Sequence, residues 1–327
     1  MARVGIIGGG AFGTAMACIV RRSDHVTTLW ARENEVVTAI NADRGNPLFL
    51  PDVRLESGIH ATSDLGEATR QQDFLLLAVP AQHLRAIANQ LRPLLADGIP
   101  IVICSKGIER GSCALMPEVV ADAIPAATVA VLSGPSFAKE IARDLPCGVA
   151  LACRDALVRA RLVNAIGTPR FCVHPNDDVI GTALGGVMKN VIAIASGIAA
   201  GRKLGENARA TVMTLGLAEA TRLAVAKGAR IETFLGLAGI GDLALTANSL
   251  QSRNTSLGVA LGQGRTLRAV LGERKEVTEG AFSVEAIVAL ARRLGVTMPL
   301  SEAIDQVLNH GADLDATIAR WMELTRV

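Results

Sequence analysis

The chain has 327 residues, enough for two domains of ordinary size, and half of its residues are apolar, which excludes an intrinsically disordered protein. Its 33 basic and 31 acidic residues leave a formal net charge of +2, so a nucleic-acid partner is not expected. The apolar runs are far shorter than the roughly 20 residues of a spanning helix, so no membrane span is expected.

Several residue types narrow the chemistry further. The chain has no tyrosine, which excludes any dehydrogenase mechanism that uses a tyrosine as its proton donor. Its six cysteines and five histidines are scattered, without a CxxC or HExxH spacing, so neither a zinc site nor any other metal cofactor is expected. Scattered cysteines are typical of reduced, buried thiols, which predicts a cytoplasmic protein.

The first half of the chain alternates short apolar runs with helical patterns, which is typical of a parallel sheet covered by helices on both faces. After about residue 177 the strand patterns stop and long helical patterns follow. We therefore predict a doubly wound α/β domain over residues 1–177 and an all-α domain over residues 178–327. Strands are expected at 3–7, 26–31, 74–79, 101–104, 129–132, 148–152 and 171–173, and helices at 11–22, 81–92, 114–124, 156–165, 179–200, 206–227, 255–262, 282–293 and 300–310.

A glycine motif, G-x-G-x-x-G, connects the first expected strand to the first expected helix, with its glycines at Gly8, Gly10 and Gly13. In this context Gly8 would allow a tight turn, Gly10 the close approach of a pyrophosphate, and Gly13 contact between helix and strand. The N–H groups and dipole of the helix N-terminus also favour an anion. The motif predicts a Rossmann-type dinucleotide-binding domain.

Arg32 follows the second expected strand, where a NAD-selective domain usually carries an acidic residue. A guanidinium group suits the 2′-phosphate of NADP(H), whereas the adjacent Glu33 leaves room for the ribose diol of NAD(H). NADP(H) is therefore favoured over NAD(H), and a solvated Arg32 without a role in binding is the alternative.

Two polar segments follow strands of the same sheet. Lys106 comes after the strand at 101–104, and the glycine-containing segment 133–138 comes after the strand at 129–132. The carboxyl ends of strands in an open α/β sheet face the ligand crevice, so we expect Lys106 to point toward the cofactor. The segment 133–138 would offer backbone N–H groups there.

The helical half contributes two further candidate groups. Lys189 lies in an otherwise apolar helix, where an ammonium group is costly unless it reaches solvent or a ligand, and the nearby Gly185 and Gly186 favour a functional role. Farther along, the glycine-rich segment 236–241 would let Asp242 approach another element. The segment 252–254 (Ser-Arg-Asn) is expected at a helix start, where it could bind a phosphate or carboxylate or serve only as a helix cap.

The order of the motifs GGGAFGTA, LAVPAQ, SKG, SGPSFAKE, LGGVMKNVIAI, GLAGIGDLALT, SRN and VTEG resembles that of the bacterial NAD(P)-dependent glycerol-3-phosphate dehydrogenase family over residues 3–310. The resemblance implies reversible reduction of dihydroxyacetone phosphate to sn-glycerol 3-phosphate, the backbone of phospholipids. It implies Lys189 as the general acid and base. The implied substrate-binding residues are Lys106, Gly134, Ser136, Lys189, Asp242, Ser252, Arg253 and Asn254, and the implied cofactor residues are Gly8, Gly10, Ala11, Phe12, Gly13, Arg32, Lys106, Ala138, Arg253, Val277 and Glu279.

The sequence departs from the family pattern at two places. Leu215 stands where the family commonly has an arginine, and the stretch 264–276 is slightly shortened. Two alternative functions stay open at this point: a related hydroxy-acid dehydrogenase of the same architecture, and a non-catalytic NADP-binding sensor. The oligomeric state also stays open, with a homodimer as one alternative.

Overall fold

The computed structural model describes residues 1–273 and 278–324, and the chain divides into two compact units. The first comprises Met1–Ser105 and Met116–Thr182, and the second comprises Lys106–Leu115 and Ala183–Val327. The boundary expected near residue 177 lies just before a long helix, α8 (Val179–Gly201), and the first unit extends about one turn into it. The segment Lys106–Leu115 therefore belongs to the same unit as Ala183–Val327, which comes much later in the sequence.

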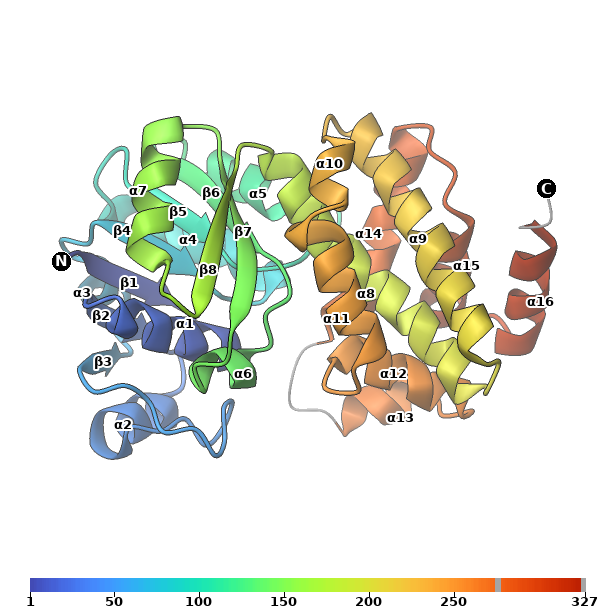
Figure 1. Cartoon of the computed structure of the whole chain (residues 1–327), viewed down its shortest axis with the longest axis horizontal. Coiled ribbons are helices and arrows are strands. Elements are labelled where there is room, and N and C mark those ends of the chain that lie inside the picture. Colours follow the sequence, from blue (N-terminus) through green and yellow to red (C-terminus); the bar gives the residue numbers. More distant parts are fainter. Residues whose placement is uncertain (274–277, 325–327) are drawn as a thin grey trace. The chain divides into compact units, whose positions relative to one another are not determined.

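The first unit is built on an eight-stranded sheet with the order β3-β2-β1-β4-β5-β6-β7-β8, drawn in blue to green in Figure 1. All neighbouring strands run parallel except β6 and β7, and this sheet confirms the predicted doubly wound fold. The strands are β1 (Arg3–Ile7), β2 (Val26–Trp30), β3 (Ile59–Thr62), β4 (Phe74–Leu77), β5 (Pro100–Ile103), β6 (Thr128–Ser133), β7 (Cys147–Cys153) and β8 (Phe171–Asn176).

The antiparallel pair β6 and β7 is a departure from the parallel arrangement of the predicted sheet. The connection between them contains only the five-residue helix α6 (Ala138–Ala142). Such a helix is about 8 Å long, whereas a six-residue strand such as β6 spans about 20 Å, so it cannot return the chain along the sheet. The chain therefore turns back beside β6, and β7 and β8 continue the sheet from there.

Helices cover both faces of this sheet (Figure 1). One group consists of α1 with α6 and α7, and the other contains α3, α4 and α5. Apolar strand residues such as Val4, Ile6 and Leu76 are fully buried between them. Besides α6, the helices that precede α8 in this unit are α1 (Ala11–Arg22), α2 (Asn34–Asp43), α3 (Leu65–Thr69), α4 (Leu84–Leu91), α5 (Met116–Ala123) and α7 (Ala156–Ile166), with short 3₁₀ turns at Ala81–His83 and Arg92–Leu94.

In the residues that the structure describes, the second unit consists of helices and the loops between them, with an isolated bridge between Ile108 and Leu115 in its non-helical segment. Its central helix α8 is long and apolar enough to cross a membrane, but most of it is buried inside the protein, as in the core helix of a folded domain. The other helices are α9 (Glu206–Ala226), α10 (Ile231–Phe234), α11 (Asp242–Asn248), α12 (Arg253–Gly262), α13 (Leu267–Gly272), α14 (Glu279–Arg293), α15 (Pro299–Asn309) and α16 (Leu314–Leu324), with a π-helical turn, η3, at Leu237–Gly241.

Glycines bring α8 and α12 into backbone contact. A Cβ atom added to Gly258 would lie 2.1 Å from the Ile194 carbonyl oxygen, and one added to Gly197 would lie 2.2 Å from the Thr255 carbonyl oxygen. Gly201 and Gly262, one helical turn farther on, meet in the same way. Only glycine permits so close an approach. This packing fixes the start of α12 relative to α8.

Side chains of α14 hold the segment Lys106–Leu115 within the second unit. Arg110 pairs with Glu285 at 2.9 Å, and the Arg293 guanidinium donates to the carbonyl oxygen of Ser112 at 2.8 Å.

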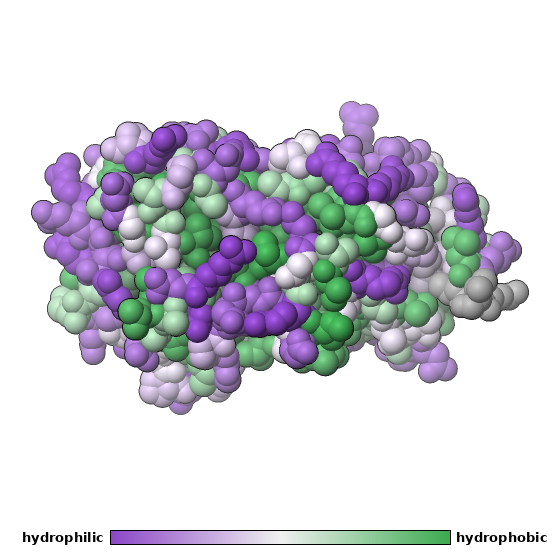
Figure 2. Space-filling model, turned by 90° about the horizontal axis from the view of Figure 1, so that it is seen from above, coloured by the Kyte–Doolittle hydropathy of each residue, from purple (hydrophilic) through white to green (hydrophobic). Residues whose placement is uncertain are grey.

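Hydrophilic and apolar residues are interspersed on the face of the protein shown in Figure 2.

Candidate active site

The glycine loop of the first unit leads from β1 into α1. Gly8 has a φ of +126°, a conformation that favours glycine, and a Cβ atom added to Gly13 would lie 1.9 Å from the Gly8 carbonyl oxygen. At Gly10, in contrast, an added Cβ atom would have no neighbour within 4 Å. Two glycines of the motif are thus required by packing, and the third borders open space.

The start of α1 suits a dinucleotide pyrophosphate. Gly10 is the N-cap of this helix and contributes no side-chain cap, and the half-buried Ala11 and Phe12 form the first turn. Uncapped N–H groups at a helix start favour a phosphate, and the open space at Gly10 leaves room for one. These residues therefore fit the cofactor that the glycine motif predicts.

Arg32 lies two residues after the end of β2, with its side chain 77% exposed. Its Nη2 atom donates to Glu33 Oε1 at 2.7 Å, and its Nε atom donates to the same oxygen at 3.1 Å. A 2′-phosphate would therefore share this guanidinium group with Glu33.

The segment after β6 forms a second loop of the first unit. Gly134 has a φ of +143°, and the Ser136 hydroxyl donates to its carbonyl oxygen at 2.7 Å. Ala138 begins α6. The substrate and cofactor roles of these three residues stay predictions.

The second unit gathers two lysines around one buried aspartate. Asp242, 1% exposed, begins α11, and its Oδ1 atom accepts a hydrogen bond from Lys189 Nζ at 2.7 Å. Its Oδ2 atom accepts from Lys106 Nζ at 2.6 Å. Lys189 Nζ also donates to Thr246 Oγ1 at 2.9 Å. We call Lys106, Lys189, Asp242 and Thr246 the lysine–aspartate cluster.

The cluster changes the acidity of its members. Burial, strengthened by the positive charges of Lys106 and Arg253, lowers the pKa of Lys189 to about 8, although Asp242 acts in the opposite direction. Burial alone would raise the pKa of Asp242, but Lys106 and Lys189 outweigh it and hold that pKa below its usual range. Asp242 is therefore a carboxylate at neutral pH, and Lys189 can change its protonation state near pH 8.

Glycines again make this contact possible. A Cβ atom added to Gly185 of α8 would lie 2.2 Å from the Ala238 carbonyl oxygen, and one added to Gly239 would lie 2.2 Å from the Phe234 carbonyl oxygen. The π-helical turn η3 therefore lies directly against α8. The close packing of Gly185 places Lys189, one turn later on α8, beside Asp242 at the end of η3.

The segment 252–254 lies at the start of α12. The Ser252 hydroxyl caps the helix by accepting from the Thr255 N–H at 3.2 Å, and the exposed Arg253 is the first helical residue. Asn254 donates to Asn190 Oδ1 at 2.8 Å and accepts from the Gly280 N–H at 3.0 Å. This asparagine thus links α12 to α8 and to the start of α14, where Glu279 lies.

The predicted site residues thus fall into two groups, one in each unit. Two further residues emerge from the structure: Thr246, which binds the Lys189 ammonium group, and Asn190, which binds Asn254. Thr246 lies four residues after Asp242, a spacing that places both on one face of a helix and that could have indicated it. Val277, a predicted cofactor residue, lies outside the described residues.

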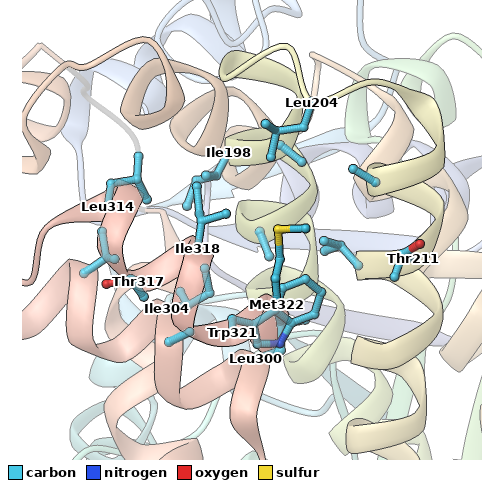
Figure 3. A pocket seen from close by; sticks show the side chains of 16 residues that line it. Ile198, Leu204, Thr211, Leu300, Ile304, Leu314, Thr317, Ile318, Trp321 and Met322 are labelled. Atoms are coloured by element: carbon cyan, nitrogen blue, oxygen red, sulfur yellow. The ribbon is translucent and has the colours of Figure 1, made fainter. Parts of the chain in front are cut away.

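The second unit also contains an apolar pocket of about 330 Å³ among α8, α9, α15 and α16 (Figure 3). Ile198, Leu300 and Trp321 line it, and its lining includes none of the predicted site residues. The pocket lining is mostly apolar and includes no ionisable side chain that could transfer a proton, so the pocket is not the candidate active site.

Comparison with known proteins identifies the family. Residues 3–158 match the N-terminus, and residues 178–319 the C-terminus, of NAD-dependent glycerol-3-phosphate dehydrogenase. The chain is 49% identical to glycerol-3-phosphate dehydrogenase (NAD(P)+) of Parvibaculum lavamentivorans over 97% of this chain and 95% of the relative. It is 52% identical to glycerol-3-phosphate dehydrogenase (NAD(P)+) of Rhodospirillum rubrum over 96% of this chain and 90% of the relative.

A solved structure agrees with the sequence comparison. The crystal structure of glycerol-3-phosphate dehydrogenase from Coxiella burnetii matches with a TM-score of 0.94 and 35% sequence identity, and it covers 98% of this chain and 99% of that chain. The resemblance noted from the motifs is therefore confirmed over nearly the whole sequence. The chain belongs to the NAD-dependent glycerol-3-phosphate dehydrogenase family.

Proposed function

We propose that this protein catalyses the reversible, NAD(P)H-dependent reduction of dihydroxyacetone phosphate to sn-glycerol 3-phosphate, which supplies the backbone of phospholipids. The observation that carries the proposal is the lysine–aspartate cluster in a chain of this family. An ammonium group with a pKa of about 8, buried and held by a carboxylate, is suited to donate a proton to a carbonyl oxygen.

A nicotinamide cofactor, when bound, would supply the hydride, and Lys189 is proposed to supply the proton. In reduction the Lys189 ammonium group donates a proton to the carbonyl oxygen of the substrate, and in oxidation its amine removes the proton of the alcohol. Asp242 and Thr246 hold the nitrogen by hydrogen bonds of 2.7 and 2.9 Å, so that it keeps one orientation. Lys106 balances the charge of Asp242 and adds a positive charge that polarises the carbonyl group.

Arg253 is the proposed receptor of the substrate phosphate. It begins α12, so its guanidinium group and the N–H groups of the first turn can bind the same anion. Ser252 and Asn254 support this start of the helix. For Gly134 and Ser136, which lie in the first unit, a role in substrate binding stays a prediction from the family resemblance. A fixed phosphate would hold the carbonyl carbon in place for hydride transfer.

The cofactor is proposed to bind at the glycine loop, with Gly8, Gly10 and Gly13 shaping the turn and the start of α1 holding the pyrophosphate. Arg32 is proposed to bind the 2′-phosphate of NADP(H). The resemblance to the family also implies cofactor contacts for Lys106, Ala138, Arg253 and Glu279, which are proposed here, whereas Val277 lies outside the described residues.

The test of the reaction follows the loss of NADPH absorbance with dihydroxyacetone phosphate, unphosphorylated dihydroxyacetone and a panel of 2-keto acids. We expect turnover with the phosphorylated ketone. Lys189→Met keeps the length and helix propensity of the side chain but should lower kcat by about 10²–10⁴-fold, with NADPH binding retained. Preference for a keto acid would support a hydroxy-acid dehydrogenase, and an absence of turnover with every substrate would support a sensor.

The test of cofactor preference uses Arg32 and its neighbour. Arg32→Ala should weaken NADPH binding about tenfold, the effect of about 1.4 kcal/mol, and leave NADH binding nearly unchanged. Glu33→Gln should act in the opposite direction, because it frees the guanidinium group from its carboxylate partner. Equal losses for both cofactors in Arg32→Ala would contradict a role in binding the 2′-phosphate.

A further inference from the structure

A buried asparagine outside the glycine motif contacts the glycine loop. Asn46 lies in the segment between α2 and β3 and is 1% exposed. Its Nδ2 atom donates to the Gly9 carbonyl oxygen at 2.9 Å and to Thr14 Oγ1 at 2.9 Å. The Thr14 hydroxyl in turn donates to the same carbonyl oxygen at 3.3 Å. The Gly9 carbonyl group is thus held from two sides inside the protein.

Holding this carbonyl group also orients the next N–H group. The C=O of Gly9 and the N–H of Gly10 belong to one planar trans peptide group, in which they point in opposite directions. Because Asn46 fixes the oxygen toward the interior, the Gly10 N–H is directed away from it. Gly10 also borders open space, because a Cβ atom added to it would meet nothing within 4 Å.

The position of Asn46 is itself fixed by its own loop. Its Oδ1 atom accepts from the Phe49 N–H at 3.2 Å, and its carbonyl oxygen accepts from the Leu50 N–H at 2.8 Å. At the ends of the loop, the Arg44 guanidinium donates to the Leu55 carbonyl oxygen at 2.8 and 3.1 Å. The Leu55 N–H donates to the backbone carbonyl oxygen of Arg44 at 2.8 Å. Hydrogen bonds within the protein therefore hold the Asn46 amide in place.

We propose that Asn46 is a positioning residue for the cofactor, which holds the Gly9–Gly10 peptide group so that the Gly10 N–H faces the bound pyrophosphate. This inference rests on the proposed function only in taking the glycine loop as the dinucleotide site. Asn46 acts through the backbone and has no contact with the reacting atoms. Its loss should therefore weaken cofactor binding without slowing the chemical step.

A second asparagine provides a matched control. Asn41 of α2 donates to the Ala61 carbonyl oxygen at 2.8 Å and accepts from the Ala61 N–H at 2.9 Å. It thus joins two elements of the same unit through its side-chain amide, as Asn46 does, but its hydrogen bonds involve β3 and not the glycine loop. Asn41→Ala and Asn46→Ala should both lower stability in urea unfolding, and only Asn46→Ala should affect the cofactor.

The experiment measures NADPH binding by fluorescence titration, together with kcat and the two KM values. Asn46→Ala should weaken NADPH binding about tenfold, the effect of losing one of the two hydrogen bonds that hold the buried Gly9 carbonyl group. Asn46→Asp should weaken it more, because a carboxylate repels the Gly9 oxygen. The value of kcat at saturating NADPH and the KM for dihydroxyacetone phosphate should stay at their wild-type levels.

Two results would overturn the proposal: unchanged NADPH affinity in folded Asn46→Ala, or an equal loss of affinity in Asn41→Ala. If Asn46→Ala does not fold, Thr14→Val and Thr14→Ser replace it. Valine removes the hydroxyl that bridges Asn46 and Gly9, whereas serine keeps it, so only valine should weaken NADPH binding, and equal effects would refute the idea. The titration needs no turnover, so its outcome is separate from the identity of the substrate.

Discussion

Asp242→Asn tests the proposed proton donor by removing the carboxylate that pairs with both lysines of the cluster. Two unit charges 2.7 Å apart, the distance between Lys189 and Asp242, attract each other by about 6 kcal/mol at an effective dielectric constant of ~20. A pKa shift of one unit corresponds to about 1.4 kcal/mol. The loss of about a quarter of this attraction is therefore enough to lower the pKa of Lys189 by one unit.

The direction of the effect follows from the role of each protonation state. Reduction needs the Lys189 ammonium group, so kcat should fall as the pH rises through the wild-type pKa of about 8. Without Asp242, burial and the charges of Lys106 and Arg253 lower this pKa further. The alkaline fall of kcat should therefore move to lower pH by about one unit or more. The acidic limb of the reverse oxidation, which needs the amine, should move in the same direction.

The assay records kcat against pH in both directions at saturating cofactor, with NADPH titrations and circular dichroism to confirm that the variant is folded. Asp305→Asn is the control. Asp305 is also a buried aspartate of the second unit, but its hydrogen bonds are to Asn309 and His310 and not to Lys189. Its pH profile should match that of the wild type. An Asp242→Asn profile with an unshifted limb and intact NADPH binding would show that Lys189 is not the titrating group.

Three further predictions concern the phosphate, a buried carboxyl group and the helix packing. Arg253→Ala should raise the KM for dihydroxyacetone phosphate by about tenfold or more and leave the activity on dihydroxyacetone nearly unchanged; an equal loss on both would point to another role. Burial, opposed by hydrogen bonds from Leu300 and Ser301, raises the pKa of Glu219, so its stabilising contribution is present at low pH and is lost as the pH rises through that pKa. Urea unfolding should therefore show that Glu219→Gln is more destabilising at acidic than at neutral pH, and a constant difference would contradict this. Gly258→Ala should lower the free energy of unfolding by about 1–3 kcal/mol, because the added methyl group overlaps the backbone of α8. Gly272→Ala is the control and should not lower it, because the space around Gly272 is open. Equal effects of the two substitutions would argue against this account of the packing.

The parts of the fold that were predictable from the sequence have strong local signals. The predicted bounds of α1 agree with the structure, because the glycine motif marks its start and a continuous apolar face follows. In contrast, α2 buries only Val36 and Ile40, and β3 is a four-residue strand at the sheet edge, so neither has a clear apolar pattern and both were missed. The glycine-rich segment 236–241 was expected to let Asp242 approach another element, but neither its π-helical form nor its contact with α8 through Ala238 could be read from the sequence.

The candidate site shows the same limit. The sequence indicated that Lys189 and Asp242 are functional, because both stand out in apolar or glycine-rich surroundings. It could not indicate that Lys106 shares the carboxylate, since Lys106 and Asp242 are 136 residues apart. Nor could it indicate Asn46, because nothing in its local sequence shows that its amide binds the Gly9 carbonyl group. Contacts of this range depend on how separate elements pack.

The membership of Lys106–Leu115 in the second unit has a consequence for how the protein is made. During synthesis this segment leaves the ribosome with the strands around it, long before α11 and α14, the helices that carry Asp242, Glu285 and Arg293. The sheet can therefore fold first, whereas the segment Lys106–Leu115 can form its contacts only after α11 and α14 have been synthesised. A chain cut between the two family regions would likewise separate Asp242 from one of its two cations, so neither fragment would contain a complete lysine–aspartate cluster.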